Sequence, residues 1–211
     1  MTKPTANLCV IATGKYLGFL LPMLMSARRY FLADFAVAFH VWTDAAISLD
    51  SLFAPRLHPN SMDAQVVCHR VCHEPWPYVS LHRFRTLLAS TDDLLKADFT
   101  FFADVDALFV RPVGEDILST LVAVKHPGLV GRPPEQLPFE PNPASSAWVP
   151  VELRRTYYAG GFQGGRTESW LQACREIDGR IRIDEKNNVM AVSHDESHWN
   201  CYMAFRPPAR T

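Results

Sequence analysis

Short apolar runs that alternate with helix-like segments are the feature of this sequence that most restricts its fold. Residues 7–13, 35–44 and 66–71 are apolar, β-branched runs of strand length, and residues 15–32 carry a helical pattern between the first two. Strands that alternate with helices in this way build a mostly parallel sheet covered on both faces. The pattern therefore predicts an α/β fold in which ligands gather at the carboxyl ends of the strands.

The second half of the chain continues this alternation. We predict a helix over 79–97, strands over 98–106 and 121–128, a proline-rich loop over 127–150, a glycine-rich turn over 157–165 and a helix that begins near Thr167.

Composition and charge exclude several classes of function. The 211-residue chain is 48% hydrophobic and 20% charged, as in globular proteins, and its net charge of −1 argues against a nucleic-acid partner. The run that comes nearest to a membrane span, residues 15–32, contains Pro22 and several cations, so we expect no transmembrane segment. The five cysteines, an odd number mostly among apolar neighbours, favour reduced core thiols in a cytosol-like compartment.

The run TFFADVDALFV places Asp104 and Asp106 among apolar residues. Burying an ionised carboxylate without a partner costs several kcal/mol, so two of them call for a cation. Residues two apart on an extended backbone point to the same face, with Val105 pointing away. Hard oxygen ligands select Mn²⁺ or Mg²⁺, and such a pair can grip a diphosphate through the metal. The alternative is a solvated turn, because short matches of this kind are common by chance.

Three further segments could carry chemistry. Residues 157–165 hold four glycines in six positions, which lets backbone approach a ligand closely, but they match neither nucleotide-binding fingerprint. In HDESH (194–198) the histidines are four apart, yet the glutamate stands third rather than second, which disfavours a zinc hydrolase. A capped helix start explains part of that motif. The spacing of CHRVCH (68–73) fits neither haem attachment nor a zinc finger, and we favour a strand there.

Taken in order along the chain, these motifs resemble glycosyltransferase family 6, the retaining enzymes that include the blood-group A and B transferases and alpha-1,3-galactosyltransferase. The similarity extends to KYLGFLLPML, HVWTD, the segment from Trp76 to Phe84, and FEPNPASSAWVP, and it covers nearly the whole chain. The resemblance implies a GT-A fold, a Rossmann-like, mostly parallel sheet with one nucleotide-sugar site. It also implies that residues 1–211 form a single cytoplasmic catalytic domain without membrane anchor or stem, as in bacterial or phage members.

The same resemblance assigns a donor site. Asp104 and Asp106 match the pair that holds Mn²⁺ (or Mg²⁺) against the diphosphate of a UDP-sugar. Further positions that match donor-binding residues are Ile11, Ala12, Thr13, Tyr16, Arg83, Val105, Ala159, Gly160, Gly161 and Asp195. The triplet that begins at Ala159 matches the segment that selects the donor sugar, and its small residues favour UDP-GalNAc over UDP-Gal.

Glu196 matches the acidic residue beneath the anomeric carbon, where a carboxylate acts as nucleophile or stabilises oxocarbenium charge. It would also contact the acceptor, as would His126. The implied reaction is retaining alpha-1,3-transfer of GalNAc (or Gal) to an oligosaccharide acceptor, a beta-galactoside with or without fucose. Ser193 departs from the family, because the animal enzymes have a tryptophan there that packs on the acceptor.

The chain also ends without the family's C-terminal segment, whose basic residue closes over the diphosphate. Arg206 or Arg210 could replace that residue, although we favour solvated tail positions for both. Without such a lid, we expect donor hydrolysis to compete with transfer. Two other classes of function stay open at this point: a metal-dependent phosphohydrolase that uses the same aspartates and histidines, and an inactive carbohydrate-binding protein.

Overall fold

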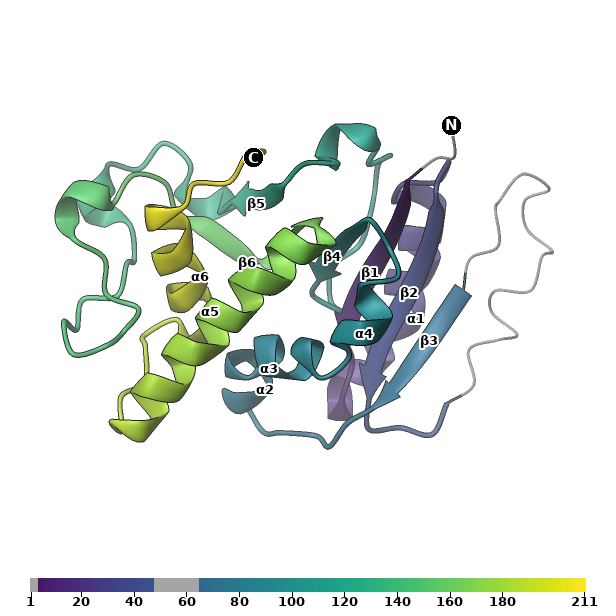
Figure 1. Ribbon diagram of the computed structural model, residues 1–211, viewed down its shortest axis with the longest axis horizontal. Coiled ribbons are helices and arrows are strands. Elements are labelled where there is room, and N and C mark those ends of the chain that lie inside the picture. The colour runs from purple at the N-terminus through teal and green to yellow at the C-terminus, as the bar shows by residue number, and fades with distance from the viewer. Residues whose placement is uncertain (1–3, 48–64) are drawn as a thin grey trace.

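The computed structural model describes residues 4–47 and 65–211, which form a six-stranded sheet with helices on both faces (Figure 1). The strands are β1 (Thr5–Ile11), β2 (Ala36–Thr43), β3 (Gln65–Arg70), β4 (Phe99–Ala103), β5 (Leu121–Lys125) and β6 (Tyr158–Arg166). Their order across the sheet is β3-β2-β1-β4-β6-β5. The first four in that order pair in parallel, and β6 runs antiparallel to both of its neighbours. The mostly parallel, GT-A-like α/β fold expected from the sequence is confirmed.

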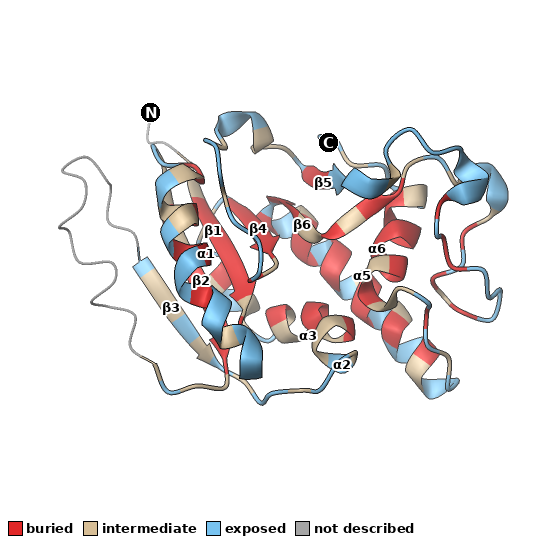
Figure 2. Ribbon diagram, turned by 180° about the vertical axis from the view of Figure 1, so that it is seen from behind, coloured by how far each residue is buried: buried red, intermediate tan, exposed pale blue. Residues whose placement is uncertain are grey.

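Helices cover both faces of this sheet. They are α1 (Leu17–Tyr30), α2 (Tyr78–Leu81), α3 (Arg83–Leu88), α4 (Thr91–Leu94), α5 (Thr167–Lys186) and α6 (His194–Phe205). Short 3-10 turns lie at Gly14–Tyr16, Glu115–Ile117, Pro127–Leu129, Pro134–Gln136 and Val151–Leu153. Helix α1 lies behind the sheet in Figure 1 and in front of it in Figure 2, whereas α5 crosses the opposite face. Within the described ranges, no helix is both long and apolar enough to span a bilayer.

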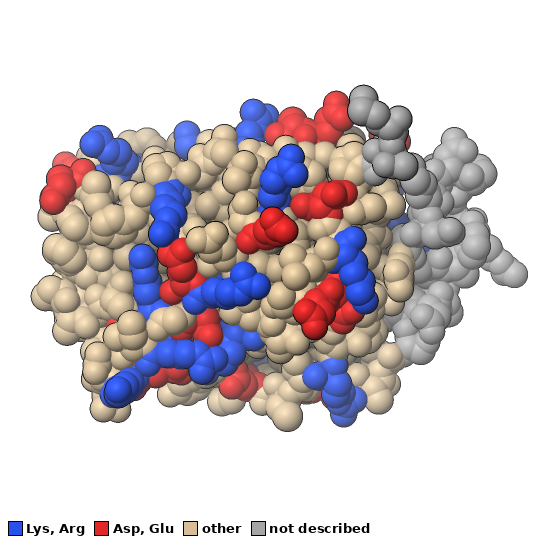
Figure 3. Space-filling view, in the orientation of Figure 1, with Lys and Arg blue, Asp and Glu red and all other residues tan. Residues whose placement is uncertain are grey.

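The core consists of apolar layers on the two faces of the sheet. Alternate residues of β1 point in opposite directions, so Leu8 and Val10 pack with Met23 of α1, while Cys9 packs with Trp170 of α5. This burial on both sides explains why the parallel strands read as nearly continuous apolar runs. On the face shown in Figure 3, acidic and basic side chains are interspersed and form no single basic patch, which is consistent with the low net charge.

The predicted single helix over 79–97 is wrong, because this stretch forms the three short helices α2, α3 and α4. The interruption between α3 and α4 has a local cause. Ser90 has φ −115° and ψ 28°, outside the helical region, and the Thr91 hydroxyl donates to the carbonyl of Leu88 at 2.7 Å. Serine and threonine hydroxyls that satisfy nearby backbone groups compete in this way with helix continuation.

The predicted glycine-rich turn over 157–165 is also wrong, since most of it lies in β6, between β4 and β5. Glycine here serves close strand packing. A Cβ atom on Gly164 would lie 2.5 Å from the carbonyl oxygen of Thr100, so a larger residue would push β4 and β6 apart.

The cysteines only partly follow the expectation. Cys9, Cys174 and Cys201 are buried, but Cys68 and Cys72 are exposed. Cys68 lies on β3, so the strand predicted for the CHRVCH segment is confirmed. Strand β3 lies at the edge of the sheet and leaves alternate side chains outside the core. The apolar neighbours of the cysteines in the sequence did not reveal this exposure.

A chain of hydrogen bonds crosses the parallel strands through two histidines. His40, which is 2% exposed, places Nε2 3.2 Å from Oδ1 of Asn7 and Nδ1 2.9 Å from Nε2 of His69. Nδ1 of His69 lies 3.1 Å from the Ser90 hydroxyl. Every contact is satisfied when both rings are neutral, with each Nε2 donating and each Nδ1 accepting. Burial, and then the neighbouring His69, lowers the pKa of His40 to about 4.

This geometry predicts acid sensitivity through His40. Its pKa is about 4 in the folded state against 6.5 for an unperturbed histidine, so the unfolded chain takes up the proton first as pH falls. The stabilisation is therefore complete above about pH 6.5 and is lost on acidification towards pH 4, on the order of 3 kcal/mol in all. Denaturant unfolding at pH 7 and pH 4.5 should show a smaller loss for His40→Gln than for the wild type. Equal losses would contradict the assignment.

Candidate active site

The candidate site lies where the strand order reverses. Strand β2 pairs with β1 on one side and β4 pairs with β1 on the other. In parallel sheets, ligands bind at the carboxyl ends of the strands where the order reverses in this way. Thr13 follows the end of β1 and Asp104 directly follows β4. Two adjoining cavities open at this edge, and they share Trp76, Ser80, Arg83 and Asp104 among their lining residues. The first adds Ile11, Thr13, Tyr16, Val105 and Asp106, and the second adds Gly160, Gly161, His194, Asp195 and Glu196.

Arg83 connects the two cavities. It opens α3 and is only 8% exposed. Its Nη1 lies 3.2 Å from Oδ1 of Asp104 and donates to the carbonyl of Gly160 at 3.0 Å. Its Nε lies 2.9 Å from Oδ2 of Asp195 and forms an ion pair with it. The Nε–H bond does not point at this oxygen, so the contact is not a hydrogen bond. The guanidinium also sits 4.7 Å from the centre of the Phe102 ring, which adds a cation–π contact.

The charges around Arg83 change each other's ionisation. Burial opposes the positive charge of Arg83, but Asp195, Asp104 and Glu196 outweigh it and raise its pKa. Burial is also the largest effect on Asp195, whose pKa rises to about 7 even though Arg83 pulls it down. Asp104 and Glu196 add to that rise. The site therefore holds several carboxylates against a single guanidinium.

Asp104 and Asp106 lie in a turn and not on an extended strand. Strand β4 ends at Ala103, and the amide of Ala107 donates to the carbonyl of Asp104 at 3.1 Å. The prediction of an extended backbone across the pair is therefore wrong. Both aspartates nevertheless line the first cavity, and Val105 packs into the apolar cluster on the α1 side.

Glu196 is held by the backbone of β6. Its Oε2 accepts the N–H of Gly160 at 2.8 Å, and a Cβ on Gly160 would lie 3.4 Å from Oδ2 of Asp195. A Cβ on Gly161 would lie 2.7 Å from Oδ2 of Asp104. These glycines allow close approach, and the groups that approach them are the site's own carboxylates. The approach of a ligand to this backbone stays a prediction.

Some predicted site residues lie outside both cavities. Ala12 is buried in the core, Ala159 is half-buried, and neither lines a cavity. The ring of His126 packs 6.2 Å from that of Tyr157, and His126 lines neither cavity. Arg206 pairs with Glu176, and Arg210 pairs with Asp116 at 3.0 Å, so neither takes the place of a basic lid residue.

Sequence reasoning missed two residues that align β6 with α6. The side chain of Asn200 accepts the N–H of Tyr158 at 2.7 Å and donates to the carbonyls of Tyr158 and Glu196 at 2.8 and 2.9 Å. The Tyr157 hydroxyl is buried near Ser193 and Glu196, and burial, followed by the charge of Glu196, raises its pKa. Tyr157 opens the glycine-rich segment 157–165 and Asn200 lies two residues beyond HDESH, but the roles of both depend on contacts between distant segments.

Glu140 is a third residue without an assigned role. It is 2% exposed, and its carboxylate accepts the N–H groups of Asn142 at 2.9 Å and of Val192 at 2.6 Å. The contact fixes the segment that enters α6 against the proline-rich loop. In the sequence, an acidic residue between Phe139 and Pro141 was the one sign that this position makes a specific contact.

The donor set fits a divalent ion. Asp104 has 39% of its side chain exposed and Asp106 is exposed, so oxygen ligands face the first cavity. Arg83 is the only Lys or Arg among the described residues that line either cavity, which leaves an excess of negative charge. No larger group of His, Cys, Asp and Glu gathers as a ligand set in the described ranges. A two-carboxylate site suits Mn²⁺ or Mg²⁺, which keep water and phosphate oxygens as their other ligands.

Comparison with known proteins identifies the family. The model of glycosyltransferase family 6 matches residues 1–211. The chain belongs to glycosyltransferase family 6. Over 212 residues it is 30% identical to histo-blood group ABO system transferase 1 of Rattus norvegicus, covering 100% of this chain and 60% of that protein.

Two further members of the family are similar to this chain. Globoside alpha-1,3-N-acetylgalactosaminyltransferase 1 of Canis lupus familiaris is 30% identical over 98% of this chain and 58% of its own length. The O-antigen biosynthesis glycosyltransferase WbnI of Escherichia coli is 28% identical over 96% of this chain and 83% of its own length. The chain thus spans about three fifths of the two animal relatives it matches.

The charge arrangement predicts a large stability effect of Arg83. Replacing it with methionine leaves Asp195 buried without its cation, so we expect Arg83→Met to lower the free energy of unfolding by about 3 kcal/mol. Arg83→Lys keeps the charge and should lose less. Adding Asp195→Asn to Arg83→Met should recover part of the loss. Denaturant unfolding measures all of these, and an Arg83→Met protein as stable as the wild type would contradict the account.

Proposed function

We propose that this chain transfers GalNAc (or Gal) from a UDP-sugar to the hydroxyl of a beta-galactoside, with or without fucose, forming an alpha-1,3 linkage with retained configuration. The observation that carries the proposal is the position of Glu196 and Asp195 in the second cavity, beside Asp104 and Asp106 in the first. The printed names of the relatives support it, since one is an alpha-1,3-N-acetylgalactosaminyltransferase. In this proposal residues 1–211 act as one GT-A catalytic domain.

In the proposed donor complex, the first cavity holds the nucleotide. Ile11 and Tyr16 offer apolar surface for the base and ribose, and Thr13 offers a hydroxyl. Asp104 and Asp106 face the diphosphate end of the cavity, where a bound Mn²⁺ (or Mg²⁺) would supply positive charge that favours departure of UDP. Asp104 and Asp106 would bind that ion through their carboxylate oxygens.

The second cavity is the proposed reaction centre. The Gly160 N–H holds the Glu196 carboxylate at the cavity wall, where it can stabilise oxocarbenium charge or attack the anomeric carbon. Asp195, fixed by Arg83, accepts hydrogen bonds from the sugar hydroxyls in this scheme. For the configuration to be retained, an acceptor hydroxyl would reach the anomeric carbon from the face that UDP leaves. Contact of His126 with the acceptor stays a prediction.

No observation favours the phosphohydrolase alternative. That function would need both histidines of HDESH beside the aspartates. His194 lines the second cavity, but His198 is 1% exposed and faces Asp184 at 3.7 Å. Burial lowers the pKa of His198 to about 4, which suits a neutral core histidine.

Transfer should depend on Glu196. We expect Glu196→Gln to lower kcat at least about 100-fold, within the range usual for a positioned carboxylate that acts in the transition state. The assay uses Mn²⁺, each UDP-sugar, and lactose or 2'-fucosyllactose, with NMR of the product to read the anomeric linkage. Glu168→Gln, an exposed glutamate in the first turn of α5, is the matched control. Wild-type rates in Glu196→Gln would remove Glu196 from the mechanism.

The donor preference should be moderate. Gly160 and Gly161 line the second cavity without side chains that could exclude an acetamido group. We therefore expect kcat/KM to favour UDP-GalNAc over UDP-Gal by roughly 10- to 200-fold, the discrimination usual for a shape-selective pocket. Steady-state kinetics with both donors tests this. A kcat/KM that favours UDP-Gal would refute the preference while leaving the transferase itself in place.

A further inference from the structure

One wall of both cavities comes from a segment with little anchoring of its own. Residues 74–80 contribute Trp76 and Ser80 to both cavities and Val79 to the first, yet none of the seven residues is buried. Trp76 is 71% exposed. The single-turn helix α2, which begins within this segment at Tyr78, buries only Leu81. Apolar packing therefore holds residues 74–80, the wall segment, only weakly. Another interaction must fix the position of this segment.

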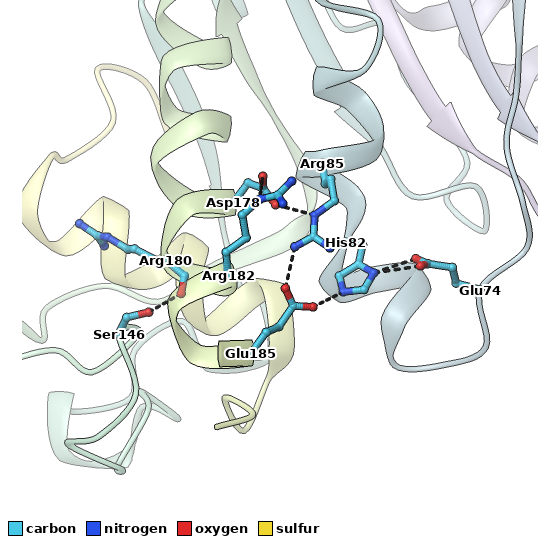
Figure 4. Close-up of polar contacts among 8 residues, drawn as sticks. All are labelled: Glu74, His82, Arg85, Ser146, Asp178, Arg180, Arg182 and Glu185. Carbon is cyan, nitrogen blue, oxygen red and sulfur yellow. Dashed lines mark hydrogen bonds and ion pairs between the residues drawn. The ribbon is translucent and has the colours of Figure 1, made fainter. Parts of the chain in front are cut away.

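His82 supplies a constraint of the right kind (Figure 4). Its Nδ1 lies 2.9 Å from a carboxylate oxygen of Glu74, at the start of the wall segment. Its Nε2 lies 2.6 Å from Oε1 of Glu185, near the end of α5. Carboxylate oxygens only accept hydrogen bonds, so both contacts form together when both ring nitrogens carry hydrogen. The ring then bridges two anions.

The α5 end of this bridge is itself braced. Arg85 donates from Nη2 to the other oxygen of Glu185 at 2.7 Å and from Nε to Asp178 at 3.0 Å. The side chain of Arg85 is 31% exposed and that of His82 is 12% exposed, so the network is partly shielded from water. Charged contacts with low exposure are worth more than surface ion pairs.

We propose that His82 is a positioning residue for the donor site. It ties the wall that carries Trp76, Val79 and Ser80 to α5 through Glu74 and Glu185. His82 also directly precedes Arg83, so the same bridge fixes the point at which the chain enters the charge cluster. The residue acts through the wall and not by touching the donor. The proposal rests on the proposed function, because it takes the first cavity as the nucleotide site.

The test compares variants at the centre of the network and at its Glu74 end. His82→Leu removes both contacts, and Glu74→Gln weakens one of them at a side chain that is 42% exposed, where folding is at little risk. Lys96→Gln is the matched control: it removes an ion pair with Asp93 at 2.6 Å, its side chain is 75% exposed, and neither residue lines a cavity. The readouts are amide hydrogen exchange of residues 74–80, UDP affinity in the presence of Mn²⁺, and melting temperature.

We expect faster exchange over residues 74–80 in His82→Leu and Glu74→Gln, together with UDP binding weakened about tenfold and about threefold respectively. Lys96→Gln should exchange and bind like the wild type. Unchanged exchange in both wall variants would overturn the bridge. Faster exchange with unchanged UDP affinity, or a lower melting temperature alone, would make the bridge purely structural. A wild type that shows the exchange pattern but does not bind UDP would instead overturn the proposed function.

Discussion

The guanidinium of Arg83 lies among Asp104, Asp195 and Glu196, and the rest of the site is arranged around that imbalance of charge. The position of the cation is set by the core, because α3 buries Phe84 beside it and β4 places the Phe102 ring beneath it. A buried carboxylate without such a partner would cost several kcal/mol. One cation cannot neutralise three acids, so the remaining charge is available for a metal ion and a substrate.

Close backbone approach is the second constraint, and it comes from β6 and α6. Gly160 brings its N–H to Glu196, and Gly161 leaves space for the carboxylate of Asp104. Asn200 keeps the two elements in register through three hydrogen bonds. The acids on α6 and those after β4 thus meet across β6, although they lie about 90 residues apart in the chain.

Much of the fold and the position of the acids could be predicted from local patterns. Apolar runs of strand length located β1 to β5, and apolar flanks singled out Asp104 and Asp106, which line the first cavity. Local patterns failed where a distant partner decides the structure. The glycines of β6 look like a turn until β4 is placed beside them, and Ser90 breaks a helix that the apolar spacing favours.

Residues that act across the structure were equally invisible in the sequence. His82 meets Glu185, and Glu140 meets the backbone of Val192, over separations that no motif spans. The resemblance to the family predicted roles for single residues, but it carried no information on contacts particular to this chain. The contacts of His82 are of this particular sort, because its partners come from the wall segment and from the end of α5.

The central claim is that the unbalanced carboxylates after β4 hold a divalent ion against a nucleoside diphosphate. Calorimetric titration of UDP with and without Mn²⁺, into the wild type and into an Asp104→Asn, Asp106→Asn double variant, tests it most directly. The account predicts that Mn²⁺ tightens UDP binding to the wild type at least about tenfold, or 1.4 kcal/mol, and has no effect on the double variant. The same gain with Mn²⁺ in both proteins would contradict it.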